Sequence, residues 1–152
     1  MRQLTTCCLI LMLTIGTAMA SGVIVNDDLY LGIWTPIASR WETRVPVCIW
    51  SEDESAYRIS VSGATTGRRF KLANDIGDKV RYRVYWHTGR NYKKRERLRP
   101  TVPSRRAYAF SPERNCADGF NAQIRVRVSK RQIDRAPPGV YNDTLLLILS
   151  PL

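Results

Sequence analysis

The chain has 152 residues, and its 24 lysines and arginines outweigh 13 aspartates and glutamates to give a formal net charge of +11 at pH 7. A chain of this length accommodates one ordinary domain. His87 is the only histidine, which leaves too few ligands for a zinc cage, and no Ser-His-Asp spacing surrounds it. We therefore expect no metal, no cofactor and no enzymatic activity, and a small secreted hydrolase is the weakest of the functions considered.

Residues 1–20 have the features of a secretory signal peptide. Arg2 precedes an apolar stretch from Leu9 to Ile15, and Ala18-Met19-Ala20 is a small-residue cleavage site. The apolar stretch is too short to span a bilayer, so a retained membrane anchor is the lesser alternative. We expect export through a cleaved signal peptide, with residues 21–152 forming a single domain.

Two cysteines, Cys48 and Cys116, remain once Cys7 and Cys8 leave with the signal. Exported proteins form disulfides in their oxidising environment, so the simplest prediction is one bond between Cys48 and Cys116. Free or intermolecular thiols are the alternative.

Short strands separated by turns are predicted along the whole chain. Residues 79–86 show the pattern best, because Val80, Tyr82, Val84 and Trp86 alternate with polar or half-polar residues in the period of two that marks a half-buried strand. The predicted strands, in chain order, are Leu29–Trp34, Arg44–Trp50, Tyr57–Val61, Arg69–Ala73, Lys79–Trp86, Arg106–Phe110, Ile124–Val128 and Leu145–Leu149. No stretch keeps a helical apolar period over ten residues, so we predict an all-β sandwich. Basic residues alternate along several strands, which predicts one exposed, positive sheet face.

The positive charge is concentrated between Lys79 and Arg106, where eleven basic residues accompany a single acid, Glu96. The densest part gives a candidate anion-binding patch: Lys93, Lys94, Arg95, Arg97 and Arg99. Such a field favours lipopolysaccharide, anionic glycans, nucleic acid or an acidic protein. The alternative is a solvated loop, because charge alone identifies no ligand.

The last predicted strand is unusually apolar. Turn signals at Pro138-Gly139 and Asn142-Asp143 precede Thr144 and the unbroken apolar run Leu145, Leu146, Leu147, Ile148 and Leu149. An apolar run of this length is normally buried on both faces, and an uncovered edge of this kind pairs readily with another strand. Either an earlier segment covers this edge or a second protein does. Leu145, Leu147 and Leu149 form one parity set, and the sequence leaves open which set faces the core.

Several motifs occur in the order found in the spore coat protein U domain, which the chain resembles. Gly139–Leu145 is similar to the Gly-x-Tyr-x-Asp-Thr signature of that family. The family's early aromatic-Gly-aromatic strand is similar to Leu29–Trp34. Its cysteine-containing strand and the strand that follows resemble Val47-Cys48 and Tyr57–Val61, and its central strand resembles Val80–Tyr85. The resemblance extends over roughly residues 29–150.

Members of this family are pilin-type subunits of archaic chaperone–usher pili, and the resemblance implies an immunoglobulin-like β-sandwich that lacks its final strand. A periplasmic chaperone supplies that strand first, and a neighbouring pilus subunit replaces it in the fibre. The implied acceptor edge is Thr144–Leu149. The implied partners are the chaperone, the outer-membrane usher and neighbouring subunits, and the implied location is the periplasm and then a cell-surface fimbrium involved in adhesion or biofilm formation.

The chain departs from the family in two respects. Only Val23-Ile24-Val25 precedes the first domain strand, which is too short for a donor extension, and Cys116 lies late in the chain. A subunit that accepts a strand without donating one suits a fibre tip or a terminator. The alternative function is a stand-alone exported module that binds an anionic glycan or lipopolysaccharide through its basic face, with no specific nucleic-acid recognition expected. Tyr141 and Asp143 are expected to make structural hydrogen bonds, similar to a tyrosine corner.

Overall fold

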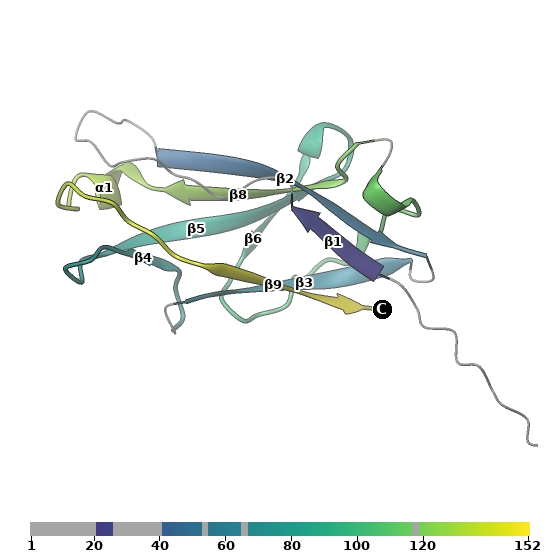
Figure 1. Cartoon of the computed structure of the whole chain (residues 1–152), viewed down its shortest axis with the longest axis horizontal. Helices are drawn as coiled ribbons and strands as arrows, with labels where there is room; N and C mark the ends of the chain where they lie inside the picture. Colours follow the sequence, from purple (N-terminus) through teal and green to yellow (C-terminus); the bar gives the residue numbers. More distant parts are fainter. Residues whose placement is uncertain (1–20, 26–40, 53–54, 65–66, 117–118) are drawn as a thin grey trace, which may run out of the picture.

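The computed structural model describes residues 21–25, 41–52, 55–64, 67–116 and 119–152. Two antiparallel sheets pack face to face in an immunoglobulin-like sandwich, which confirms the all-β prediction (Figure 1). The predicted signal peptide and the predicted strand at Leu29–Trp34 lie outside the described residues. None of the helices in the described part of the chain has the length and apolar character needed to cross a membrane.

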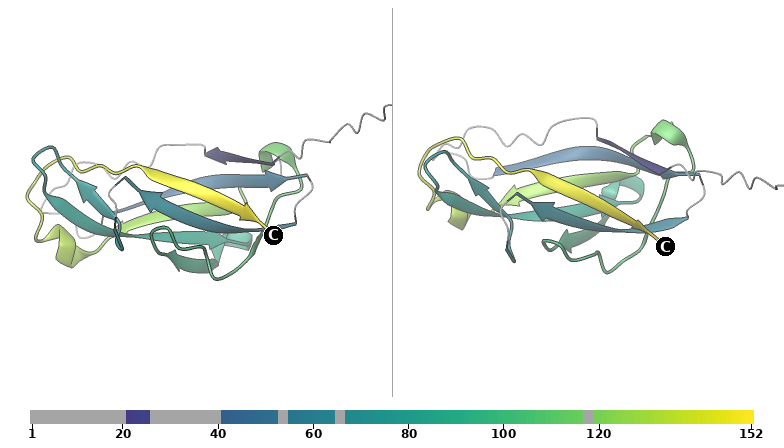
Figure 2. Two further views of the ribbon diagram at one scale, coloured as in Figure 1. Left: turned by 90° about the horizontal axis from the view of Figure 1, so that it is seen from below. Right: turned by 60° about the horizontal axis from the view of Figure 1, so that its bottom comes forward.

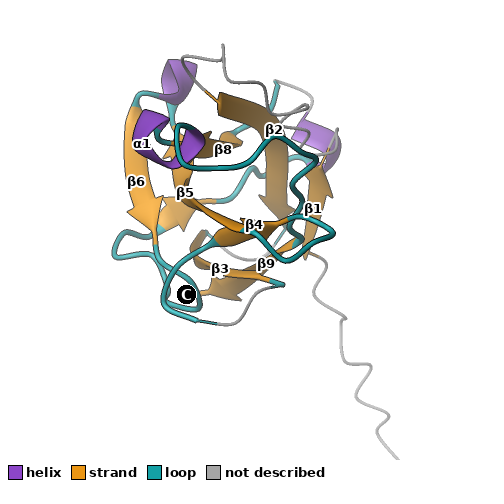
Figure 3. Ribbon diagram, turned by 90° about the vertical axis from the view of Figure 1, so that its left-hand side faces the viewer, coloured by secondary structure: helices purple, strands orange, loops and turns teal. Residues whose placement is uncertain are grey.

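The larger sheet has the strand order β1-β2-β8-β5-β4, and β6 also pairs with β5. Its strands are β1 (Ser21–Val25), β2 (Trp41–Ser51), β4 (Lys71–Ala73), β5 (Lys79–Thr88), β6 (Lys94–Leu98) and β8 (Ala122–Val128). Three short helices lie between strands: η1 (Arg90–Tyr92) joins β5 to β6, and η2 (Arg114–Cys116) and α1 (Lys130–Ile133) lie before and after β8. Viewed along its length, this sheet forms the top and one side of the sandwich (Figure 3).

The smaller sheet has the order β7-β3-β9, with strands β7 (Tyr108–Ala109), β3 (Ala56–Gly63) and β9 (Leu145–Pro151). β3 lies between the other two, and β9 runs antiparallel to it from Leu145 opposite Gly63 to Pro151 opposite Tyr57 (Figure 2). β9 is therefore an edge strand of this sheet within the described part of the chain.

The core lies between the two sheets and follows from the period-two patterns. In β5 the buried residues Val80, Tyr82, Val84 and Trp86 alternate with exposed arginines, and in β3 Tyr57, Ile59 and Val61 are fully buried. Complete burial of one large apolar side chain stabilises a fold by roughly 1.5–3 kcal/mol before conformational entropy is subtracted. The core therefore depends on side chains contributed alternately by both sheets.

Seven of the eight predicted strands fall in the described residues, and each overlaps an observed strand. The overlap is smallest at Arg106–Phe110, where only Tyr108–Ala109 is extended and paired. β1 and β6 were not predicted as strands. β6 lies in the basic run Lys93–Arg99, whose charge hides a period-two alternation in which Leu98 is buried while Arg97 is exposed. β1 pairs with β2 from Ser21 opposite Ser51 to Val25 opposite Val47.

Candidate functional site: an open strand edge and an arginine-lined hollow

The register of β9 on β3 decides which of its side chains face the core. Leu147 lies opposite Val61 and Leu149 opposite Ile59, and both β3 residues are fully buried. Residues directly opposite each other in a ladder point to the same face, so these two leucines and Leu145 face the core. They pack against it but stay only half-buried.

Leu146 and Ile148 point outward, with 59% and 48% of their surface exposed. Two large apolar side chains on one short strand are therefore open to solvent on the outer face of the smaller sheet, while the alternate three are incompletely covered on its inner face.

The main chain of β9 is satisfied on one side. The N–H of Ala64 donates to the carbonyl oxygen of Thr144 at 3.0 Å, and the N–H of Leu152 donates to that of Ala56 at 3.1 Å. Hydrogen-bonded pairs alternate in an antiparallel ladder, so Leu146 and Ile148 exchange bonds with β3. The N–H and C=O groups of Leu145, Leu147 and Leu149 consequently point away from β3. We call this side of β9, which has no paired strand among the described residues, the open edge.

The opposite edge of β3 is covered. The N–H of Thr101 donates to the carbonyl of Val61 at 2.8 Å, and the N–H of Ser104 donates to that of Ile59 at 2.7 Å. The Ser104 hydroxyl in turn accepts the N–H of Ile59 at 3.1 Å. The strand next to β9 therefore has partners on both sides, unlike β9 itself.

Asp143 fixes the start of β9, in agreement with its expected structural role. Its carboxylate accepts the N–H groups of Ala64 and Thr144, each at 2.9 Å, and the hydroxyl of Tyr82. Burial, together with donation to this carboxylate and its negative charge, raises the pKa of Tyr82 well above its usual value. A side chain at Gly63 would place its Cβ 2.7 Å from an Asp143 oxygen, so glycine is needed for this close approach.

Tyr141 is buried, and its hydroxyl donates to the carbonyl oxygen of Pro137 at 3.0 Å. A tyrosine hydroxyl bonded to the backbone a few residues upstream is the arrangement of a tyrosine corner. Tyr141 also packs edge-on against Trp41, with ring centroids 6.1 Å apart. These contacts hold the turn that leads into β9, as the sequence predicted.

The structure contains a disulfide between Cys48 and Cys116, which are 68 positions apart in the sequence and have Cα atoms 5.8 Å apart. The bond joins β2 to η2 and is buried. The pairing expected from the exported context is present in the fold.

The predicted anion-binding patch is divided by the strand on which most of it lies. Tyr85 lies opposite Arg97 and His87 opposite Arg95, so these two arginines are on the outer face of the larger sheet. Lys94 has the other parity and contacts the turn at Gly89. Alternation along β6 therefore separates side chains that are consecutive in the sequence.

Glu96, the only acid in the basic region, has a structural role. Its carboxylate accepts the N–H of Arg105 at 2.7 Å, the hydroxyl of Tyr108 at 2.7 Å and the N–H of Arg106 at 3.3 Å. Partial burial would raise the pKa of Glu96, but these hydrogen bonds and the charge of Arg106 outweigh burial and lower that pKa. Glu96 is thereby engaged with the segment between β6 and β7 and with Tyr108 on β7.

His87 is buried beside the same outer face. One ring nitrogen lies 3.1 Å from the carbonyl oxygen of Tyr92. Burial lowers the pKa of His87, the carbonyl opposes this shift, and the charges of Arg125, Arg95 and Arg44 add to the lowering. The imidazole is therefore held neutral, and in the described residues no group of three or more histidine, cysteine or acidic side chains surrounds a possible metal position.

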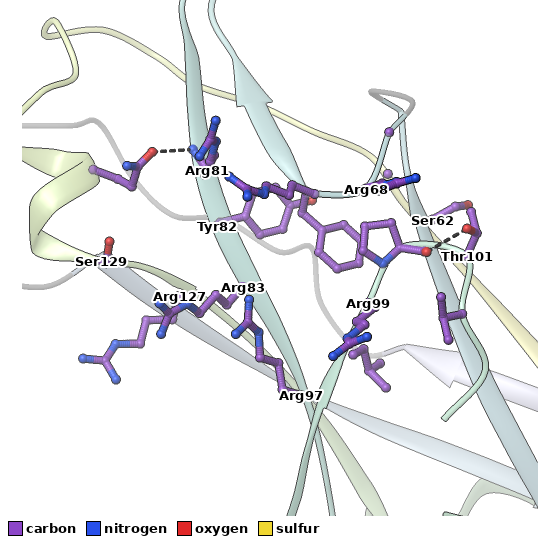
Figure 4. Close-up of a pocket in the computed structure, with 18 of the residues that line it drawn as sticks. Ser62, Arg68, Arg81, Tyr82, Arg83, Arg97, Arg99, Thr101, Arg127 and Ser129 are labelled. Carbon is purple, nitrogen blue, oxygen red and sulfur yellow. Dashed lines mark hydrogen bonds between the residues drawn. The ribbon is translucent and has the colours of Figure 1, made fainter. Parts of the chain in front are cut away.

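A hollow of about 1330 Å³ opens between the outer face of the larger sheet and the ends of β3, β4 and α1 (Figure 4). Nine exposed arginines line it, and we call it the arginine hollow: Arg68, Arg69, Arg81, Arg83, Arg97, Arg99, Arg127, Arg131 and Arg135. Only Arg97 and Arg99 belong to the predicted patch. The alternation of arginines along residues 79–86 and 124–128 was the sequence signal for the sheet part of this surface, whereas the contributions of α1 and the segment before β4 had none.

No family model matches the chain, and no curated protein matches it in sequence. Its fold is similar to a solved chain from a study of a chaperone–tip adhesin complex vital for synergistic activation of CFA/I fimbriae biogenesis. The TM-score is 0.65 at 8% sequence identity, over 87% of this chain and 41% of the other. The chain thus spans less than half the length of that protein. At this identity the likeness establishes the all-β fold alone, and the resemblance to the spore coat protein U domain stays a prediction.

Proposed function

We propose that this protein is a non-enzymatic subunit of a chaperone–usher pilus and that its β9 edge accepts a strand from a chaperone or a neighbouring subunit. The observation that carries the proposal is the condition of β9. Its core-facing leucines are half-buried, and the main-chain groups of the same residues point to the side where no described strand lies. The likeness in fold to a chain from a study of a chaperone–tip adhesin complex supports the same assignment.

An added strand would supply both the hydrogen-bond partners and the side-chain cover that the open edge lacks. Main-chain groups of Leu145, Leu147 and Leu149 would gain hydrogen bonds, and alternate side chains of the incoming strand would cover the leucines that face the core. An exposed apolar edge left alone pairs with other chains and promotes aggregation. A chaperone that lends a strand during export would prevent this, which fits a periplasmic stage followed by a cell-surface fimbrium.

The segment Ser21–Val25 bears on the position in the fibre. It contains Val23-Ile24-Val25, the apolar stretch that most resembles a donor segment. All five residues of Ser21–Val25 pair with β2 of the same chain. A segment held in this way is not available to a neighbour. This pairing supports a subunit that accepts a strand without donating this one, and we propose a tip or terminating position.

Amide exchange measured residue by residue tests the proposal directly. We expect the exported protein to require co-expression with its chaperone, and to form a soluble one-to-one complex. In that complex the amides of Leu145, Leu147 and Leu149 should be protected, because the lent strand accepts their N–H groups. The amides of Leu146 and Ile148 are the internal control, since their bonds to β3 are present with or without a partner.

A pair of matched variants separates edge completion from simple hydrophobic contact. Leu147→Asp places a charge under the incoming strand and should abolish the chaperone complex, whereas Leu146→Asp places the same charge on the outer face and should retain it. A stable monomer purified without a chaperone, with all five β9 amides already protected, would contradict strand acceptance. That result would indicate that the open edge is covered by the chain itself.

The alternative function, an exported module that binds an anionic polymer, is favoured by a different observation, the arginine hollow. No residue of β9 lines the hollow, although the end of its partner β3 does, so the two functions are compatible.

A further inference from the structure

We propose that the arginine hollow is a binding site for an extended polysaccharide that carries sulfate or phosphate groups. The site is built by segments far apart in the sequence: the end of β3, the segment before β4, the middle of β5, the end of β6, the end of β8, and α1. Figure 4 shows Arg81, Arg83 and Arg127 on one side, with Arg68 and Arg99 across from them. The proposal does not depend on assembly into a pilus.

The positive charge of the hollow is not balanced by the protein. No aspartate or glutamate is among the described residues that line it. The basic partners in the ion pairs of the described residues are instead Arg44, Arg114, Arg125 and Lys130, none of which lines the hollow. None of the nine arginines of the hollow forms an ion pair with a described residue, although Glu42 on β2 lies opposite Arg127 in the register.

The register of the strands makes this arrangement unfavourable for the isolated domain. Arg83 on β5 lies directly opposite Arg127 on β8, while Glu42 on β2 lies opposite Arg127 on its other side. Like charges at directly opposite positions destabilise a sheet. A structural role alone would favour a neutral or acidic side chain opposite Arg127 on β5 as well as on β2, so the Arg83–Arg127 pair is better explained by a ligand that supplies negative charge.

The adjacent part of the same face shows the contrast. Arg125, the outward-facing neighbour of Arg127 on β8, donates to Glu42 at 2.6 Å, and Arg44 donates to the same carboxylate at 2.8 Å. One carboxylate thus neutralises part of the charge of two arginines next to the hollow. Glu42 also lies opposite Arg127 in the register, but no acidic residue is among the described residues that line the hollow, so the excess charge is concentrated there.

The chemistry of the side chains narrows the ligand. All basic residues that line the hollow are arginines, whose planar guanidinium groups bind sulfate, phosphate or carboxylate oxygens in a bidentate manner. The volume exceeds the roughly 300–1,000 Å³ of a typical small-molecule site, and nine separated cations match a ligand with repeated charges. A polymer with an anionic group on each repeat satisfies both conditions.

The other polyanions fit less well. Single-stranded nucleic acid is held by stacking on exposed aromatic rings, but Phe70 and Tyr82, the aromatic residues that line the hollow, are 3% and 6% exposed. Val102 is the exposed large apolar residue at its margin, which offers little surface for the acyl chains of a lipid. A saccharide needs neither stacking nor an apolar cavity of this kind.

Binding to immobilised heparin, measured with the folded exported chain or with its chaperone complex, tests the proposal. We compare Arg83→Gln/Arg127→Gln, at the centre of the hollow, with Lys93→Gln/Lys94→Gln, which removes the same charge from exposed positions outside it. The hollow variant should lose roughly tenfold or more in affinity, because its charge-assisted bonds are lost, and the control less than about twofold. Arg131→Gln/Arg135→Gln, outside the sheet, should reproduce the loss if the sheet variant folds poorly.

Two further probes define the ligand class. Desulfated heparin, which keeps its carboxylates, should bind much more weakly than heparin, and affinity for heparin should fall steeply with salt. Equal losses in the hollow and control variants would overturn the site, because binding would then depend on net charge alone. Binding of double-stranded DNA as tight as that of heparin at equal ionic strength would overturn the saccharide assignment in favour of nucleic acid.

Discussion

The two sheets present very different outer faces to solvent. On the larger sheet the face of β5, β6 and β8 carries exposed arginines, and nine arginines line the hollow at its end. On the smaller sheet β9 exposes Leu146 and Ile148, and its neighbour β3 exposes Arg58 beside the half-buried Ser60 and Ser62. One face is rich in charge, and the other is largely uncharged along an open edge.

The difference concerns what each surface lacks. The arginine hollow is lined in part by strands that pair within the larger sheet, but no acidic residue is among the described residues that line it. The open edge carries no excess charge but lacks main-chain partners on one side and cover for Leu145, Leu147 and Leu149. An added strand would complete the open edge, and a polyanion would neutralise the arginine hollow. The two surfaces can therefore be tested separately, because changes in salt or in arginine charge should affect the hollow and changes in the β9 side chains should affect the edge.

Loss of the disulfide should have the largest effect and should not discriminate between the two surfaces. Replacing Cys48 and Cys116 with serine opens a closed loop of 68 positions, for which we expect a loss of about 4 kcal/mol in the free energy of unfolding. Chemical denaturation of the oxidised protein and the double variant measures this loss. A reducing agent should destabilise the natural protein similarly and leave the variant unchanged. Loss of heparin binding with a retained chaperone complex would show that the two surfaces depend on the bond differently.

A change at Asp143 should affect the open edge and spare the hollow. Asp143→Asn weakens acceptance of the Ala64 and Thr144 N–H groups and of the Tyr82 hydroxyl, so we expect a loss of about 2 kcal/mol in the free energy of unfolding. Tyr82→Phe, which removes one of these bonds, should cost about 1 kcal/mol. Thermal unfolding measures both losses. Heparin affinity should be unchanged in the folded protein, and a tenfold loss there would show that the surfaces are coupled through Tyr82.

The smallest expected effect is a gain in stability. Arg83→Gln removes one charge of a like-charged pair at directly opposite positions and leaves Arg127 opposite Glu42, which should stabilise the fold by about 0.5 kcal/mol at low salt. The gain should disappear in high salt, which screens the repulsion in the natural protein as well. Arg44→Gln is the matched control, because this arginine has a carboxylate partner and its removal should bring no gain. If the Arg83→Gln variant is destabilised at low salt, Arg83 has a structural role that the register does not reveal.

The local pattern of the chain was enough to predict the fold class and most strands. Period-two alternation in residues 79–86 matches the burial of Val80, Tyr82, Val84 and Trp86 in β5, because a strand between a core and solvent selects side chains by parity alone. The pairing of Cys48 with Cys116 followed from exclusion of the cysteines in the signal. The apolar run at Leu145–Leu149 was also evident, but its parity was not.

Only the tertiary structure decided the properties that depend on registry between distant segments. The pairing of Leu147 with Val61 determined which leucines face the core, and β9 could have shifted by one residue without changing its composition. The basic run Lys93–Arg99 looked like one continuous patch, yet pairing of β6 with β5 divides it between two faces. The arginine hollow exists because β5, β8 and α1 bring Arg83, Arg127 and Arg131 to one surface. Sequence patterns specify which face of a strand each side chain occupies, whereas neighbours across a sheet are fixed only when the strands pair.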